Sequence, residues 1–161
     1  MNRKVRHIRS CEALVGNIGY GIPPQFLAVR YNGAAHPQAP IAGLNLGANC
    51  QRFVFELLRH FGYEVGAMRS SELWSDRIYT RTVYRKRRFD ILMFNGTDCA
   101  WGAHLALYLG NGRAIHLCKA IGRPAIWSES QFARCDEYKV LVAIKRPIRL
   151  KSRGAHAREP Q

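Results

Sequence analysis

The segment from which the rest of the chain can be interpreted runs Asn45-Leu-Gly-Ala-Asn-Cys50-Gln-Arg-Phe-Val-Phe-Glu-Leu-Leu-Arg-His-Phe61-Gly62. Its apolar residues recur at helical spacing and form one stripe, made of Phe53, Val54, Leu57, Leu58 and Phe61. This predicts a helix that begins near Cys50, is capped by Asn45 or Asn49, and ends at Gly62. A thiol in the first turn lies near free backbone N–H groups and the positive end of the helix dipole, which both favour the thiolate. A single cysteine of this kind more often packs as a small hydrophobe, so its role depends on the rest of the chain.

The length of 161 residues suits one domain with a substantial core. The cysteines are odd in number and their spacing suggests no disulfide framework; they are Cys11, Cys50, Cys99, Cys118 and Cys135. The basic N-terminus lacks the apolar run of a secretory signal, and no segment is long enough to span a membrane. We therefore expect a cytoplasmic protein with reduced thiols, or one exported without a cleaved signal peptide.

The formal net charge of +14 is high for this size, and the cations gather at the two ends and in residues 77–88. Tyrosines interleave with arginines in that middle segment, a pattern that some nucleic-acid binders share with exposed strands and loops. No helix-turn-helix, RNP or zinc-finger pattern accompanies the charge. The composition therefore favours nonspecific contact with polyanions over a dedicated nucleic-acid site.

The expected elements are helices first and strands later. Helices are predicted over residues 12–18, 50–61 and 70–76, the last capped by Ser70 or Ser71, and a helical turn over 128–132. Strands are predicted over residues 89–94, 104–109, 114–118, 122–126 and 138–144. This order indicates an α+β fold in which N-terminal helices carrying Cys50 pack on an antiparallel meander. We expect a single domain over 1–147, with an N-terminal extension over 1–30 that the pattern does not define and a mobile basic tail over 148–161.

The strongest hairpin pattern is His104-Leu-Ala-Leu-Tyr-Leu-Gly-Asn-Gly112-Arg-Ala-Ile-His116. A two-residue turn would pair Leu107 with His116 and place the two histidines on opposite faces. A three-residue loop would pair Ala106 with His116 and make the histidines diagonal neighbours, about 7–8 Å apart at the backbone. We predict the three-residue loop, with Gly112 at positive φ.

Cysteine nucleophiles need an adjacent base to accept the thiol proton, and the base needs a third group to orient its ring. Cys50, His104 and His116 supply these three roles if the helix start lies beside the hairpin. The backbone N–H of Cys50 would then help to hold the oxyanion.

These residues resemble the NlpC-type cysteine peptidases, bacterial cell-wall endopeptidases with a papain-like core. The family pattern Asp-Cys-Ser-Gly-Phe-Val corresponds to residues 49–54, Gly-Asp-Leu-x-Phe-Phe to 89–94, and His-Val-Gly-Ile-Tyr-x-Gly-x-Gly with Ile-His to 104–116. The match extends over roughly Tyr31 to Ile144. The resemblance implies a papain-like fold, Cys50 as nucleophile, His104 as base and His116 as the third polar residue. It also implies cleavage of a peptide or amide bond in peptidoglycan stem peptides by a monomer without cofactor or metal.

Some positions depart from the family pattern near the nucleophile. Asn49 replaces the Asp that helps to bind a free amine, and Gln51 and Arg52 replace Ser-Gly with larger groups. These three residues, Tyr31 upstream and Trp101 in the loop before the base are the candidate substrate-binding residues. An internal or anionic peptide would suit such a site better than a free stem-peptide amine.

Three other interpretations remain open. Zinc could be bound by a set comprising Cys99, His104, His116 and Cys118, although the spacings match no standard zinc motif. A non-catalytic module could use its basic surface to contact nucleic acid. A thiol acyltransferase of the lecithin:retinol type, on the same general scaffold, could transfer an acyl group to an amine, or an amidase could cleave an amide bond in a substrate unrelated to the wall.

Overall fold

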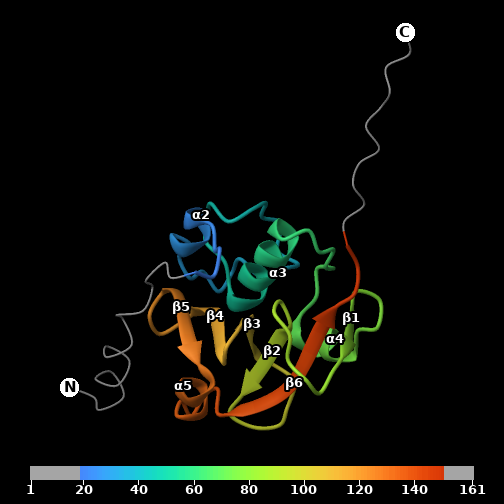
Figure 1. Ribbon diagram of the computed structural model, residues 1–161. Coiled ribbons are helices and arrows are strands. Elements are labelled where there is room, and N and C mark those ends of the chain that lie inside the picture. Colours follow the sequence, from blue (N-terminus) through green and yellow to red (C-terminus); the bar gives the residue numbers. More distant parts are fainter. Residues whose placement is uncertain (1–18, 151–161) are drawn as a thin grey trace, which may run out of the picture.

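The computed structural model describes residues 19–150, in which helices precede an antiparallel sheet (Figure 1). The elements are α2 (Pro24–Leu27), α3 (Cys50–His60), α4 (Ser70–Ser75), β1 (Thr80–Thr82), β2 (Ile91–Asn95), β3 (His104–Gly110), β4 (Arg113–Cys118), β5 (Arg123–Ser128), α5 (Glu129–Ala133) and β6 (Val140–Pro147). The predicted α+β class is confirmed. The helix expected over 12–18 and most of the expected basic tail lie outside the described residues.

The sheet has the strand order β1-β6-β2-β3-β4-β5, and all its described pairs are antiparallel. Strands β2 to β5 form the predicted meander, but β6 returns past it and inserts between β1 and β2 (Figure 1). The expectation of a simple meander was therefore wrong at this point. Alternation within a strand reports which face is buried, but it does not report which sheet edge the strand will join.

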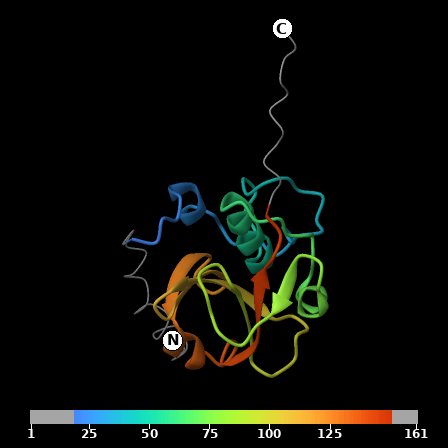
Figure 2. The same ribbon diagram turned by 45° about the vertical axis from the view of Figure 1, so that its right-hand side comes forward.

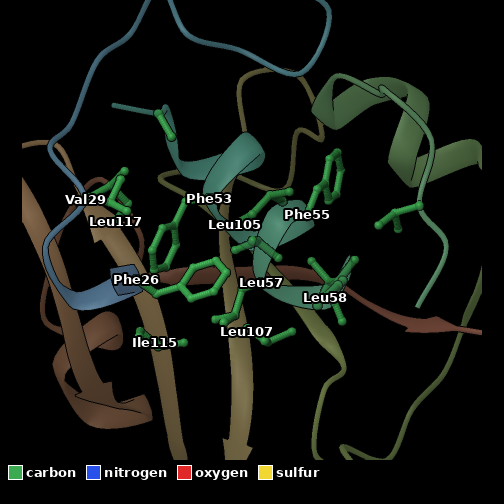
Figure 3. Close-up of a cluster of buried hydrophobic side chains, with 14 of the residues drawn as sticks. Phe26, Val29, Phe53, Phe55, Leu57, Leu58, Leu105, Leu107, Ile115 and Leu117 are labelled. Atoms are coloured by element: carbon green, nitrogen blue, oxygen red, sulfur yellow. The ribbon is translucent and has the colours of Figure 1, made fainter. Parts of the chain in front are cut away.

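Helix α3 covers one face of the sheet with the apolar stripe predicted from the sequence. Figure 3 shows its side chains facing those of β3 and β4, and Phe26 of α2 beside Phe53. The residues in this contact are fully or nearly fully buried; they include Phe53, Leu57, Leu58, Leu105, Leu107, Ile115 and Leu117. The burial of this stripe, more than helix propensity, holds an eleven-residue helix in place.

The opposite face of the sheet carries a second cluster of buried side chains, to which Phe132 of α5 belongs. Figure 2 shows α5 at the edge of the sheet away from α3. Because side chains alternate between faces, the residues of β3 and β4 that do not face α3 point into this cluster. Phe132 of α5 stacks on Phe94 of β2, with ring centroids 4.2 Å apart. The second cluster is therefore mainly aromatic on the side nearest α5.

Helix α3 is bounded by residues that the sequence identified. The Asn49 side chain accepts a hydrogen bond from the backbone N–H of Arg52 at 2.9 Å, and Gly62 has φ +90° just past the end. The predicted cap of α4 was wrong. Its N-cap is Arg69, whose backbone N–H donates to the Glu72 carboxylate at 2.6 Å, so the acid three residues later decides the start.

A buried ion pair joins β2 to β6. Asp90 is 1% exposed and accepts from Arg146 Nε at 2.8 Å and Nη2 at 2.7 Å. Its second oxygen also accepts from the backbone N–H of Arg87 at 2.7 Å. The returning strand is therefore held by a bidentate charge-assisted contact as well as by its backbone ladder.

The ends of the described chain are bound more tightly than the sequence suggested. Leu150 forms an antiparallel bridge with Tyr63, and Glu64 N–H donates to the Arg149 carbonyl at 3.0 Å. Residues 148–150, which the sequence placed in the tail, thus contact the domain. Phe26 and Val29, within the expected N-terminal extension, belong to the core.

Candidate active site

The hairpin of β3 and β4 sets the relation between the two histidines. Leu107 lies opposite Ile115 and Tyr108 opposite Ala114, and this register extends to Ala106 opposite His116, as predicted. The predicted three-residue loop is wrong in detail. Gly110 pairs with Arg113, so the turn itself holds two residues, and a bulge after Tyr108 restores the register.

The turn residues explain this arrangement. Asn111 has φ +52° and Gly112 has φ +67°, as a two-residue turn matched to strand twist requires. The predicted positive φ of Gly112 is therefore confirmed. The side chain of Tyr108 also accepts the Gly112 N–H at 3.0 Å, which ties the turn to the bulged strand.

The two histidines meet directly on the sheet face that carries the second cluster. His104 Nε2 lies 2.8 Å from His116 Nδ1, and the two rings are perpendicular at 89° with centroids 5.0 Å apart. His104 is 8% exposed and His116 is fully buried. Because Nε2 of His104 is used in this pair, its Nδ1 is the ring nitrogen left for another partner.

Cys50 opens helix α3 and lies next to the start of β3. The backbone N–H groups of Leu105, the residue after His104, and of Gln51 and Cys50 lie near its thiol and lower its pKa. The residue is half-buried, whereas Asn49 and Gln51 on either side of it are buried. The structure thus brings the first turn of α3 to the strand that carries the expected base.

The protonation states follow from burial. Burial raises the pKa of the Cys50 thiol above its ordinary 9.0, although the three backbone N–H groups and the cation Arg69 each lower it. Burial lowers the pKa of His104 to about 3, and burial followed by the charge of His104 lowers that of His116 well below 6.5. The expected thiolate preference is not found, because desolvation outweighs the helix-start donors. At neutral pH the site holds a thiol and two neutral imidazoles.

The tautomers of the histidine pair are linked. If Nδ1 of His104 is to accept a proton, Nε2 must carry the ring hydrogen and donate it to Nδ1 of His116. The hydrogen of His116 then lies on Nε2, which has no hydrogen-bond partner within residues 19–150. In that tautomer the histidine pair contains one buried N–H without a hydrogen-bond partner among residues 19–150.

The predicted substrate-binding residues next to Cys50 have structural contacts. Asn49 caps α3, and its amide lies 3.4 Å from the Gln51 side chain. Arg52 is 6% exposed and donates to the carbonyls of Gly43 at 3.3 Å and Ala39 at 3.4 Å, which fastens the preceding loop. A role of these residues in substrate binding stays a prediction.

Tyr31 and Trp101 are placed differently. Tyr31 forms a parallel bridge with Ala48, and the pKa of its phenol is raised by burial and then by the neighbouring Cys50. Trp101 is 77% exposed in the loop before β3, where Asn95 holds its backbone carbonyl at 3.1 Å. Tyr31 is therefore near the thiol, and Trp101 presents a large free ring three residues before His104; their contact with substrate stays a prediction.

An aromatic enclosure around the histidines is the part of the site that sequence reasoning missed. Tyr138 stacks on His104, with centroids 4.3 Å apart and planes at 22°. The rings of Trp127 and Phe132 pack on the ring of His116, with centroid distances of 4.4 Å and 4.9 Å. Alternation in β5 could have assigned Trp127 to the histidine face, but Tyr138 lies in the turn before β6, where no periodicity applies.

The zinc interpretation gains no set of ligands from the structure. Within residues 19–150 no group of three or more His, Cys, Asp or Glu side chains is placed to hold a metal ion. Cys99 is exposed, and Cys118 is buried in the second cluster. No helix in the same residues combines the length and apolar character needed to cross a membrane.

Comparisons with known proteins were made for the whole chain. No protein-family model and no curated protein matches it. Among solved structures it is similar to the peptidoglycan hydrolase RipB from Mycobacterium tuberculosis, with 21% identity and a TM-score of 0.48. The match covers 74% of this chain and 58% of RipB, so the chain spans less than two thirds of that protein.

Proposed function

We propose that the protein is a cysteine hydrolase that cleaves a peptide or amide bond, with peptidoglycan stem peptides as its substrate. The observation that carries the proposal is the 2.8 Å contact between His104 and His116, in which His104 belongs to the strand whose next backbone N–H, that of Leu105, lies near the Cys50 thiol and lowers its pKa. Nucleophile, base and orienting group come from a helix start and one hairpin, as thiol catalysis requires. The wall substrate is inferred from the resemblance of residues 49–54, 89–94 and 104–116 to the NlpC-type pattern.

The first step transfers the thiol proton of Cys50 to Nδ1 of His104 while sulfur attacks the scissile carbonyl carbon. A resting thiol beside a neutral imidazole makes this general-base catalysis, since the pKa of His104 is about 3 and that of Cys50 lies above 9.0. The Cys50 backbone N–H would donate to the oxyanion. In this step His116 accepts the Nε2–H of His104, which leaves Nδ1 of His104 to take the thiol proton.

The second step breaks the carbon–nitrogen bond. His104 returns its proton to the leaving amine, and an acyl group remains on Cys50 as a thioester. Water, deprotonated by His104, then attacks the thioester and releases the carboxylic acid with the thiol restored. Transfer to an amine in place of water would give the acyltransferase that the sequence also allows.

The test is product analysis on intact peptidoglycan and on synthetic stem peptides. We expect paired products whose masses sum to substrate plus one water, lost in Cys50→Ala and in His104→Ala. His60→Ala, a histidine at the far end of α3, is the matched control and should retain the activity. Turnover that survives Cys50→Ala would refute the proposal, and products that carry an added amine would replace hydrolysis by acyl transfer.

A further inference from the structure

The ring of Tyr138 occupies a place that the proposed chemistry does not use directly. It lies on the turn between α5 and β6, 7% exposed, with its backbone N–H donating to the Cys135 carbonyl at 2.8 Å. Its ring centroid is 6.1 Å from that of Trp127 and 6.4 Å from that of Phe132. A backbone hydrogen bond and contacts with Trp127 of β5 and Phe132 of α5 therefore fix the position of the Tyr138 ring independently of its contact with His104.

The histidine ring needs two constraints because two torsions orient it. The bond from Nε2 to His116 fixes where one edge of the ring lies, but it allows the plane to turn about that contact. Tyr138 lies nearly parallel to the plane at 4.3 Å and 22°, so it limits this turning. His116 meets the same ring at 89°, and the two contacts therefore restrict different motions.

The stacked ring also faces the charge that forms during catalysis. When His104 accepts the thiol proton it becomes an imidazolium in a buried setting, which burial opposes. Among residues 19–150 no carboxylate contributes to the pKa of His104. The group that orients its ring is the neutral imidazole of His116 and not a carboxylate that could balance the new charge. The electron-rich face of an aromatic ring stabilises a cation within about 6 Å.

The other ionisable groups around this stack are thiols and one acid. Cys50 lies on the α3 side, and Cys118, Cys135 and Glu137 surround the phenol. Burial and these groups raise the pKa of Tyr138, so the phenol stays neutral at working pH. The ring, and not a phenolate charge, is what Tyr138 presents to His104.

We propose that Tyr138 is a positioning residue for the base: its ring fixes the plane of His104 and stabilises the imidazolium formed when Cys50 is deprotonated. This inference rests on the proposed function, in which His104 is the base. It assigns the effect to the aromatic ring, so removal of the hydroxyl alone should be tolerated. It also predicts that His104 populates both neutral tautomers, and no longer one, when the Tyr138 ring is removed.

The experiment compares Tyr138→Leu with Tyr138→Phe in the full chain. The rate of iodoacetamide labelling at Cys50 at pH 6 should fall about tenfold in the leucine variant and stay within about twofold in the phenylalanine variant. Tyr138→Met serves the same purpose if the leucine variant does not fold. Phe26→Leu, which removes a buried ring from the other cluster, controls for general loss of packing and should keep the parent rate.

Nitrogen-15 spectra of the histidine rings give a readout that does not depend on catalysis. The parent and Tyr138→Phe should show His104 as one tautomer with its hydrogen on Nε2, whereas Tyr138→Leu should show averaging of both ring nitrogens. Equal labelling rates and equal spectra for the two variants would overturn the inference. If parent labelling does not depend on His104 at all, the proposed function fails, and the spectra still decide whether Tyr138 orients the ring.

Discussion

Replacing His104 by alanine should change how the labelling of Cys50 depends on pH, and this change tests the central assignment. Burial holds the thiol pKa above 9.0 and the His104 pKa near 3. Between about pH 5 and 8 the parent therefore contains a thiol and a base that is already neutral. Labelling assisted by this base should vary little over that range.

The magnitude follows from the fraction of thiolate. With a pKa above 9.0, fewer than about one thiol in a thousand is ionised at pH 6 without help. A positioned base typically contributes about 10²-fold to 10⁴-fold, and the low pKa of His104 places its contribution at the lower end of this range. We expect His104→Ala to label Cys50 about a hundredfold more slowly at pH 6, to gain about tenfold per pH unit, and to reach the parent rate at about pH 8.

The assay is iodoacetamide labelling followed by intact mass and peptide mapping. Cys99 is exposed in the same molecule and supplies an internal reference whose rate should be the same in parent and variant. His60→Ala reports any effect of losing a histidine elsewhere. Matching pH curves for Cys50 in the parent and His104→Ala would refute the reasoning, since the thiol would then ionise without this base.

Further outcomes follow from the packing and the charge. Asp90→Ala should lower the free energy of unfolding by about 3 kcal/mol in urea titrations, because it leaves the Arg146 guanidinium without its buried partner; a loss below about 1 kcal/mol would show that water replaces the pair. Gly47→Ala should cost more than Gly62→Ala in the same assay, since both have positive φ but only at Gly47 would a Cβ lie 2.6 Å from a backbone carbonyl oxygen. The parent should lose stability as pH falls from about 6.5 towards 3, because the pKa of His104 is depressed on folding, and His104→Ala should lose less over that window. With a net charge of +14, binding to heparin or DNA should weaken steeply with salt and be the same in Cys50→Ala; salt-independent binding would contradict nonspecific attraction.

Much of the local structure could be read from the chain because it depends on periodicity and on end residues. The stripe of Phe53, Leu57 and Leu58 specified α3, and Asn49 and Gly62 marked its ends. The alternation in residues 104–118 specified the two strands of the hairpin and which residues of each strand share a face. Short-range patterns carry this information because a side chain's face depends only on its position in the repeat.

The tertiary structure decided what depends on several elements at once. Strand β6 inserted beside β2, and a bulge allowed a two-residue turn to give the register expected of three. The helix-start donors favoured a thiolate, but burial by neighbouring elements reversed the direction of the Cys50 pKa. Tyr138 reached His104 from a turn with no repeat to reveal its face. The sequence alone specified which residues of each helix and strand face the interior. Solvent exclusion and ring stacking arise only when those elements assemble. They set the protonation and the orientation of the candidate catalytic groups.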